Sequence, residues 1–220
     1  MDRRSWCAWM TPLIWAELGK IQAVIWDLAG VLMHTNYGDF NSMLASKLQV
    51  PQEEAERVME SRENSLWDLD ELDEDEFFGF ILQELNLPAH KRETIKRVYT
   101  EDCYINTVLL TYIRGLRVSY KTALLTNFPA HIHDFMRTTW RMDGAFDQII
   151  ASCDVKLLKP DARIFQLTLD RLNVAAEAAV FIDDRWINVS AAQAFGMQGI
   201  LYQNRAQVMA DLESLLLVGG

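Results

Sequence analysis

The sequence predicts an α/β fold in which a parallel sheet is interrupted by a helical insert. Two patterns indicate this. From Val108 onward, short apolar runs alternate with helix-like segments, which is typical of βαβ units with right-handed crossovers. Between the first apolar run and this region, residues 34–107 have helical periods and no convincing strand. We therefore expect a core built from two stretches of chain with a helical cap between them.

Polar residues lie at the carboxyl end of each of these expected strands or in the loop that follows it. Residues 21–26 lead to Asp27, residues 118–127 end on Thr126 and Asn127, residues 149–151 lead by a loop to Lys159, and residues 180–182 lead to Asp183 and Asp184. A parallel sheet would gather these groups at one edge, where open α/β sheets bind ligands. Any one of them is explained by an ordinary strand-ending turn. Together they predict a nucleophile, a hydroxyl, an ammonium and a metal-binding acid pair in one site.

The remaining elements follow from periodicity and end signals. Helices are expected within residues 40–48, 51–59, 76–85, 89–99 and 187–195, and a short strand within residues 198–202. Asp73 and Glu76 have capping-box spacing, so the acidic stretch 68–76 is interpreted as a solvated helix start rather than a cation site. Pro51 and Pro160 suit first-turn helix positions.

Composition favours a compact enzyme in a reducing compartment. The chain has 220 residues, of which 50% are hydrophobic, so it can bury a substantial core. Its three cysteines are few and odd in number, which predicts a cytoplasmic protein without structural disulfides. A net charge of −10 argues against nucleic-acid binding. No run approaches the length of a membrane span.

The Trp-rich residues 1–19 form a separate N-terminal extension. They superficially resemble a signal peptide, but Pro12 and the lack of a small-residue cleavage site oppose that interpretation. We expect a short amphipathic helix packed on the body. The open alternative is a partner-binding or membrane-surface helix.

Four segments resemble the ordered motifs of the haloacid dehalogenase superfamily, especially its phosphatase-like members with a small helical cap: IQAVIWDLAGVL, ALLTN, KPDARIF and FIDDRWINVSAAQAFGM. The resemblance implies a Rossmann-like core of residues 20–33 and 108–220 and a cap of residues 34–107. It also implies that Asp27 attacks phosphorus to form an aspartyl-phosphate, while Thr126 and Lys159 hold phosphate oxygens. Lys156 is a weaker candidate for the lysine.

The same resemblance implies a magnesium ion. Asp27, the backbone carbonyl of Ala29 and Asp183 would bind Mg²⁺, with Asp184 as a further candidate ligand, since this cation prefers hard oxygen donors. Asn127 and His34 are the candidate substrate-binding residues. The expected partner is a small phosphorylated metabolite, and a homodimer remains open.

Ala29 departs from the family pattern. Phosphatases of this group usually carry a second Asp two residues after the nucleophile, where it protonates the leaving alcohol and then activates water. A methyl group cannot transfer protons, so slow hydrolysis of alkyl phosphates is expected. His34, His131 and His133 are candidate replacements, with His34 the best placed. Asn36, Tyr37 and Trp67 could contact the leaving group, although packing explains Tyr37 and Trp67 as well.

Two other functions remain open at this point. The superfamily also implies a 2-haloacid dehalogenase, in which the Asp displaces halide without metal and the missing second Asp would not matter. The Asp183-Asp184 pair opposes this reading because it suits a cation site. The third possibility is a non-catalytic protein that binds a phospho-ligand.

Overall fold

A computed structural model describes residues 20–100 and 103–218. Its core is a five-stranded parallel sheet with the order β5-β4-β1-β6-β7, so the first strand lies in the middle. The strands are β1 (Ala23–Trp26), β4 (Lys121–Thr126), β5 (Gln148–Ala151), β6 (Ala179–Asp183) and β7 (Gln198–Leu201). The predicted α/β class and parallel sheet are confirmed.

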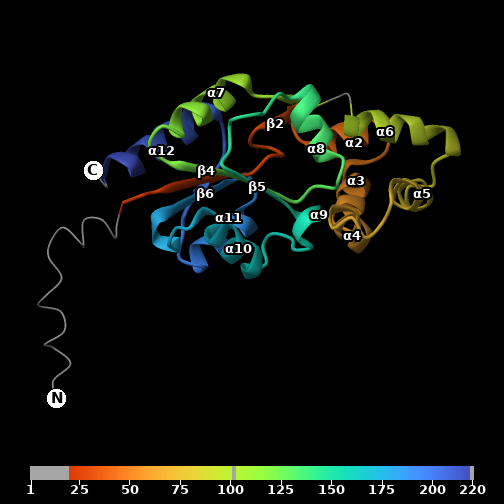
Figure 1. The fold of residues 1–220 in the computed structure, drawn as a ribbon. Coiled ribbons are helices and arrows are strands. Elements are labelled where there is room, and N and C mark those ends of the chain that lie inside the picture. The colour runs from red at the N-terminus through yellow and green to blue at the C-terminus, as the bar shows by residue number, and fades with distance from the viewer. Residues whose placement is uncertain (1–19, 101–102, 219–220) are drawn as a thin grey trace, which may run out of the picture.

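Helices cover both faces of this sheet. The core helices are α7 (Thr107–Leu116), α8 (Ile132–Asp134), η2 (Phe135–Thr139), α9 (Ser152–Val155), α10 (Ala162–Leu172), η3 (Ala176–Ala178), α11 (Trp186–Ala194) and α12 (Arg205–Val218). In Figure 1, α7 and α12 lie on one side of the sheet, whereas α10 and α11 lie on the other. Both strand faces are therefore buried, and β1 and β6 are apolar throughout until they reach their carboxyl ends.

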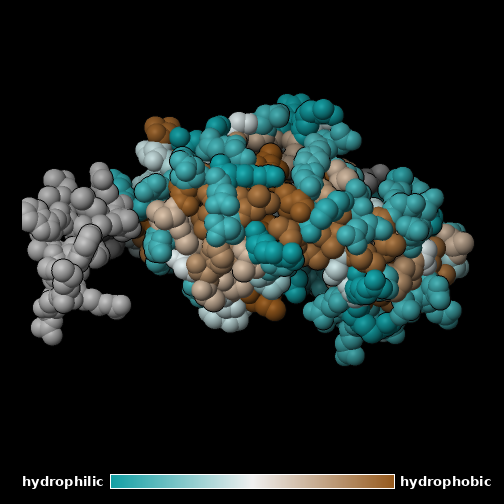
Figure 2. Space-filling view, turned by 60° about the horizontal axis from the view of Figure 1, so that its bottom comes forward, coloured by the Kyte–Doolittle hydropathy of each residue, from teal (hydrophilic) through white to brown (hydrophobic). Residues whose placement is uncertain are grey.

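The insert between β1 and β4 forms a helical layer with its own core. It contains α2 (Phe40–Leu48), α3 (Gln52–Met59), α4 (Arg62–Asp68), α5 (Glu74–Glu84), η1 (Ala89–Lys91) and α6 (Arg92–Thr100). Phe77, Phe78, Ile81 and the residues packed around them form a hydrophobic cluster separate from those of the sheet. In Figure 1 these helices lie together beside the sheet, to the right. The outer surface on that side of the molecule is largely hydrophilic (Figure 2).

The expectation that residues 34–107 contain no strand is wrong. β2 (Met33–Thr35) and β3 (Cys103–Ile105) pair antiparallel at the two ends of the insert. Each strand has only three residues, too few to show an alternating pattern, and the partner of each lies across the whole insert. The segment that enters the insert and the segment that leaves it therefore lie side by side.

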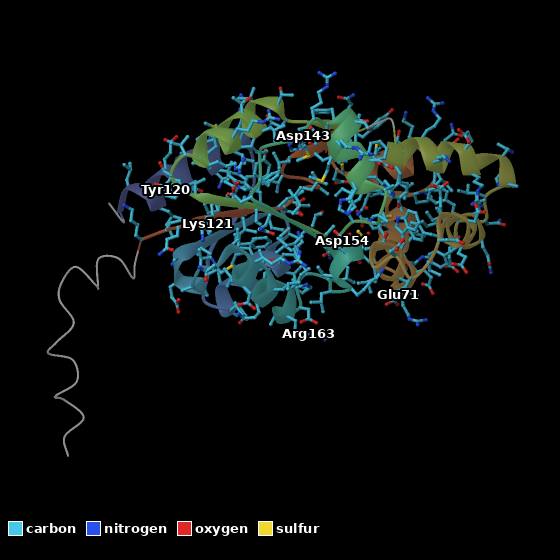
Figure 3. The ribbon with its side chains drawn as sticks, in the orientation of Figure 1. Glu71, Tyr120, Lys121, Asp143, Asp154 and Arg163 are labelled. Atoms are coloured by element: carbon cyan, nitrogen blue, oxygen red, sulfur yellow. The ribbon has the colours of Figure 1, made fainter. Side chains whose placement is uncertain are left out.

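Hydrogen bonds join the end of α4 and the loop that follows it in the insert to α9 of the core and its C-cap. Ser152 Oγ donates to the carbonyl of Asp68 over 2.6 Å, and Lys156 Nζ donates to the carbonyl of Leu69 over 2.5 Å. Glu71 and Asp154 label the two sides of this junction in Figure 3. The loop is therefore held against the core rather than projecting into solvent.

Local end signals were predicted well, with small shifts in the proline positions. Asp73 and Glu76 form the reciprocal capping box at the start of α5. Pro51 is the N-cap of α3, and Pro160 precedes Asp161, the N-cap of α10, so neither proline lies within the first turn. The expected helix in residues 1–19 lies outside the described residues. Within the described ranges, no helix has the length and apolarity needed to cross a bilayer.

Candidate active site

Three adjacent strands end side by side at the centre of the sheet. Trp26 is in register with Leu124 of β4 and Ile182 of β6, so Asp27, Thr126 and Asp183 all emerge at the same carboxyl edge. Because β1 lies where the strand order changes direction, the loops on either side diverge and leave a crevice above Asp27. The fold therefore brings together the polar groups predicted from the strand ends.

Lys159 reaches this edge from the loop after α9 and lies between two carboxylates. Its Nζ is 2.6 Å from Asp27 Oδ1 and 2.7 Å from Asp183 Oδ2, and its side chain is 2% exposed. Asn127 fixes the lysine backbone, since its amide donates to the Lys159 carbonyl over 3.0 Å and accepts from the Lys159 N–H over 2.9 Å. The amide of Asn127 thus positions Lys159 here, and its predicted contact with substrate stays a prediction.

Lys156 lies elsewhere. Its ammonium is directed to the carbonyl of Leu69 in the insert and is about half exposed. The structure therefore brings only Lys159 of the two lysines to the carboxylates.

Burial and like charges dominate the electrostatics of the site. Burial raises the pKa of Asp27 to about 8, an effect that Lys159 opposes and that Asp183 and Asp184 reinforce. Burial alone would lower the pKa of Lys159, but Asp183 and Asp27 more than offset this, so the pKa is raised and the ammonium is retained. Lys159 therefore pairs with Asp27 and Asp183, and both Lys159 and Arg185 act more weakly on Asp184.

Asp183 is fully buried and is held by its neighbours on the following helix turn. Arg185 N–H donates to Oδ1 over 2.8 Å, and Asn188 Nδ2 lies 3.0 Å from both carboxylate oxygens. Asn188 was missed from the sequence. Its position five residues after Asp183, at the start of the predicted helix, is the signal that could have identified it.

Asp27, Asp183 and Asp184 could hold a metal ion. Each offers a carboxylate oxygen, and these atoms lie within 4.8 Å of one another. Asp184 is exposed as a residue, but partial desolvation of its carboxyl and the neighbouring Asp183 raise its pKa to about 6. Hard oxygen donors crowded together with an excess of negative charge suit a divalent cation such as Mg²⁺. The donor set therefore fits the metal that the sequence predicted.

Gly30 leaves the space that Asp184 occupies. A Cβ on Gly30 would lie 2.0 Å from Asp184 Oδ2, and the residue has a φ of +81°, which favours glycine. The turn after β1 and the turn after β6 therefore meet through a position that accepts no side chain.

A cavity of about 1030 Å³ opens above these groups, between the sheet edge and the insert. Asp27, Ala29, Thr126, Lys159 and Asp184 line its floor, and the insert contributes Asn64, Asp68 and Tyr99 to its wall. Thr126 Oγ1 is buried and has no hydrogen-bond partner within the described part of the chain. A buried hydroxyl without a partner is costly, which indicates that a ligand oxygen completes the site.

The three candidate histidines have different surroundings. His34 lines the cavity, and burial lowers its pKa below the usual 6.5. His131 packs among aromatic rings, including Trp67 at 5.8 Å between centroids. His133 is exposed and pairs with Asp154 at 3.0 Å. Only His34 of these three belongs to the described lining of the cavity.

The predicted cap contacts with the leaving group are only partly supported by position. Trp67 is buried against Phe77, with centroids 5.2 Å apart, which is the packing role weighed for it from the sequence. Asn36 and Tyr37 are exposed and are not among the described residues that line the cavity. Asp68, in contrast, was assigned to a solvated helix start, yet it lies at the cavity wall.

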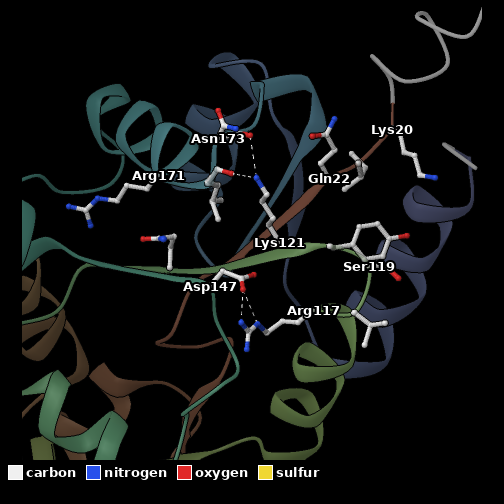
Figure 4. A pocket seen from close by; sticks show the side chains of 13 residues that line it. Lys20, Gln22, Arg117, Ser119, Lys121, Asp147, Arg171 and Asn173 are labelled. Carbon is white, nitrogen blue, oxygen red and sulfur yellow. Dashed lines mark hydrogen bonds and ion pairs between the residues drawn. The ribbon is translucent and has the colours of Figure 1, made fainter.

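A second hollow of about 670 Å³ lies at the amino-terminal edge of the sheet (Figure 4). Two of its basic side chains, those of Lys121 and Arg117, are engaged in structural contacts. Lys121 Nζ donates to the carbonyl of Leu172 over 2.5 Å, and Arg117 pairs with Asp147 over 2.6 Å. This hollow lies at the opposite edge of the sheet from the polar strand ends. The contacts around it hold the start of β4 and the end of α7 to neighbouring loops.

Comparison with known proteins is consistent with this site. A family model described as haloacid dehalogenase-like hydrolase matches residues 21–196. The chain is 28% identical over 194 residues to the phosphorylated carbohydrates phosphatase of Thermotoga maritima, covering 82% of this chain and 84% of that protein. It spans only 7%, 13% and 36% of the length of the first three curated relatives that it matches.

Solved structures share the fold at low sequence identity. A HAD family enzyme of Bacteroides thetaiotaomicron, in complex with magnesium and inorganic phosphate, has a TM-score of 0.67 and 19% identity over 86% of this chain and 98% of its own. An L-2-haloacid dehalogenase of Xanthobacter autotrophicus, with chloropropionic acid covalently bound, has a TM-score of 0.61 and 17% identity over 88% of this chain and 83% of its own. The fold alone therefore does not choose between these two reactions.

Proposed function

Because the chain belongs to the haloacid dehalogenase-like hydrolases, we propose that it is a magnesium-dependent phosphatase that acts on a small phosphorylated metabolite. The observation that carries this proposal is the arrangement of Lys159 between Asp27 and Asp183 with Asp184 beside them. Once ionised, these three carboxyl groups carry a surplus of negative charge over the Lys159 ammonium. A metal-free dehalogenase has no use for this surplus, whereas a divalent cation together with a phosphate ester does.

The residues suggest a defined division of work. Asp27 would attack phosphorus through a carboxylate oxygen and form an aspartyl-phosphate as the ester P–O bond breaks. Thr126 Oγ1, which has no partner in the buried site, would donate a hydrogen bond to a phosphate oxygen. Lys159 would favour the ionised form of Asp27, together with the bound cation, and offset the charge of the transferring group.

Asp27, Asp183, Asp184 and the carbonyl of Ala29 would hold Mg²⁺. When bound, this cation would neutralise charge shared by the nucleophile and the phosphate. Asn188 and Arg185 would position Asp183 for that role through the hydrogen bonds already described.

A substrate panel tests the reaction, the metal and the nucleophile together. We expect wild-type protein to release inorganic phosphate from phosphorylated metabolites and from p-nitrophenyl phosphate in the presence of Mg²⁺. Excess chelator should remove this activity, because the carboxylate cluster then keeps its repulsion and the substrate keeps its charge. Phosphate release, measured with and without chelator, is the readout.

Each rival function has a distinct outcome in the same experiment. Halide release from a 2-haloacid that persists in excess chelator would replace the proposal with a dehalogenase. Binding of a phosphate analogue without turnover of any ester would replace it with a phospho-ligand binding protein.

Gly30→Ala tests the proposed metal site without removing a ligand. The new Cβ would collide with Asp184 Oδ2, so we expect magnesium binding to weaken by about 10–100-fold, the range seen when groups that orient metal ligands are changed. Isothermal titration calorimetry with Mg²⁺ measures this.

The matched control is Gly144→Ala. Gly144 also has a positive φ, +70°, but its Cβ would meet nothing closer than 4.0 Å. Both variants therefore carry similar backbone strain, and only Gly30→Ala should lose metal affinity. Equal affinities in the two variants would count against Asp184 as part of the metal site.

A further inference from the structure

The proposed phosphatase reaction lacks a proton donor at the usual position, because Ala29 offers only a methyl group to the cavity. An alkyl ester needs a proton on its leaving oxygen, and an aspartyl-phosphate needs a base to activate water. Positioned acid–base groups of this kind contribute about 10²–10⁴-fold in rate. A replacement for the missing carboxyl must come from the cavity wall.

The histidines do not meet the requirement. Burial lowers the pKa of His34, so its ring is neutral at pH 7 and has no imidazolium proton to give. His131 is enclosed by aromatic rings, where burial also lowers its pKa, and His133 is paired with Asp154 on the surface.

Asp68, at the end of α4, is placed differently. It comes from the insert and lines the same cavity as Asp27, Thr126 and Lys159, and its carboxyl interacts electrostatically with the Lys159 ammonium. On its own helix, Asn64 Nδ2 contacts Asp68 Oδ2 at 3.4 Å. The residue is partly accessible at the cavity wall, while its carboxyl is well enclosed.

The backbone around Asp68 is tied to the core. Ser152 Oγ donates to the Asp68 carbonyl over 2.6 Å and accepts from the Phe128 N–H over 2.9 Å, two residues after Thr126. Lys156 Nζ holds the next carbonyl, that of Leu69. The carboxyl is thus fixed relative to the strand ends although it belongs to the insert, as a positioned acid must be.

The charged groups around Asp68 hold it near the balance between its two forms. Burial raises the pKa of its carboxyl to about 7, while Lys159 and Arg185 from the core oppose the rise. Burial, reinforced by the charge of Asp68, raises the pKa of the Tyr99 phenol on α6 well above its usual value of 10. Tyr99 therefore stays neutral. A carboxyl that holds a proton in part of the molecules at neutral pH can both give and take one.

We propose that Asp68, from the insert side of the cavity that Asp27 also lines, is the catalytic acid and base that replaces the missing carboxyl at position 29. This inference rests on the proposed phosphatase function. In the first step the Asp68 O–H gives its proton to the ester oxygen while the P–O bond breaks and the bond from Asp27 to phosphorus forms. In the second step the Asp68 carboxylate takes a proton from water as the water oxygen attacks phosphorus, which frees Asp27 and phosphate and restores the acid.

Two esters of similar size separate proton donation from binding. Benzyl phosphate releases an alcohol that needs a proton, whereas p-nitrophenyl phosphate releases a stable anion. In Asp68→Asn, kcat/KM should fall by about 10²–10⁴-fold for benzyl phosphate and by less than about tenfold for p-nitrophenyl phosphate. Because the second step also loses its base, p-nitrophenyl phosphate should give a burst of nitrophenolate followed by slow turnover.

Asp70→Asn is the matched control. Asp70 lies two residues away, is about half exposed and faces Lys156, so its loss should leave both esters at wild-type rates. In wild-type protein saturated with Mg²⁺, which would favour ionised Asp27, kcat/KM for benzyl phosphate should fall above about pH 7, where Asp68 loses its proton, and Asp68→Asn should lack this limb.

A second variant guards against a folding defect. Ala29→Asp, made in the Asp68→Asn background, should restore benzyl phosphate turnover by returning a carboxyl to position 29. Equal losses of kcat/KM for the two esters, an unchanged rate for benzyl phosphate, or no recovery in the double variant would each overturn the role of Asp68. If wild-type protein with Mg²⁺ turned over neither ester, the phosphatase function itself would fail.

Discussion

Asp27→Asn is expected to remove turnover of every phosphate ester, lowering kcat by about 10⁴–10⁶-fold, the scale seen when an enzyme loses its nucleophile. The amide keeps the shape of the carboxyl and can still accept a hydrogen bond from Lys159, which now lies 2.6 Å away. It cannot form an acyl phosphate. Steady-state phosphate release measures the loss of turnover. Acid trapping of the phosphoprotein that wild type forms measures the loss of the aspartyl-phosphate.

The control for this change is Asp143→Asn, which alters an exposed carboxyl labelled in Figure 3, away from the cavity. It should retain full activity. Phosphoprotein that still formed in Asp27→Asn, or turnover within tenfold of wild type, would show that another side chain attacks phosphorus.

Lys159→Met is expected to lower the free energy of unfolding by about 3–5 kcal/mol at neutral pH without metal, the usual cost of leaving buried charge unpaired. The methionine has a similar length, so packing against Phe181 is largely kept. What is lost is the ammonium between Asp27 and Asp183. Urea denaturation gives the change directly. Lys156→Met is the control: Lys156 is about half exposed, so the loss of its ion pair and of its hydrogen bond to the Leu69 carbonyl should cost only about 1 kcal/mol.

The deficit in the free energy of unfolding of Lys159→Met should depend on pH and on Mg²⁺. Asp27 has a pKa of 3.8 when exposed and about 8 in the folded protein, so the folded state binds more protons between these values. Stability therefore falls as pH rises through this window, and more steeply once Lys159 is gone. The deficit should be smallest near pH 4, largest above pH 8, and reduced by added Mg²⁺. A deficit that is independent of both would mean that the carboxylate repulsion is not its cause.

The core and the strand-end residues could be predicted because their signals are local. Each buried strand is a short apolar run, and each run stops where a polar side chain must reach the crevice, as with Trp26 and Asp27. Parallel pairing then places Asp27, Thr126 and Asp183 at one edge without further information. Lys159 was identified through the following proline and the family motif, and its two ion pairs came only from the structure.

The insert was harder to predict for physical reasons. Its helices have clear periods and caps, as in the box of Asp73 and Glu76. Its strands β2 and β3 are three residues long and find each other only across the whole insert, so no local pattern marks them. Asp68 belongs to an acidic run that is typical of a solvated helix start. Its backbone is nevertheless held to the core by hydrogen bonds from Ser152 and Lys156, which are far away in the sequence.

The sequence by itself determined the α/β class, the order of the polar strand ends and the absence of a carboxyl at position 29, since each is written in neighbouring residues. Only the tertiary structure decided which polar groups come together: Lys159 between two aspartates, Asn188 on Asp183, and Asp68 in the lining of the same cavity. Desolvation depends on everything that packs around a group, and most of those neighbours are distant along the chain.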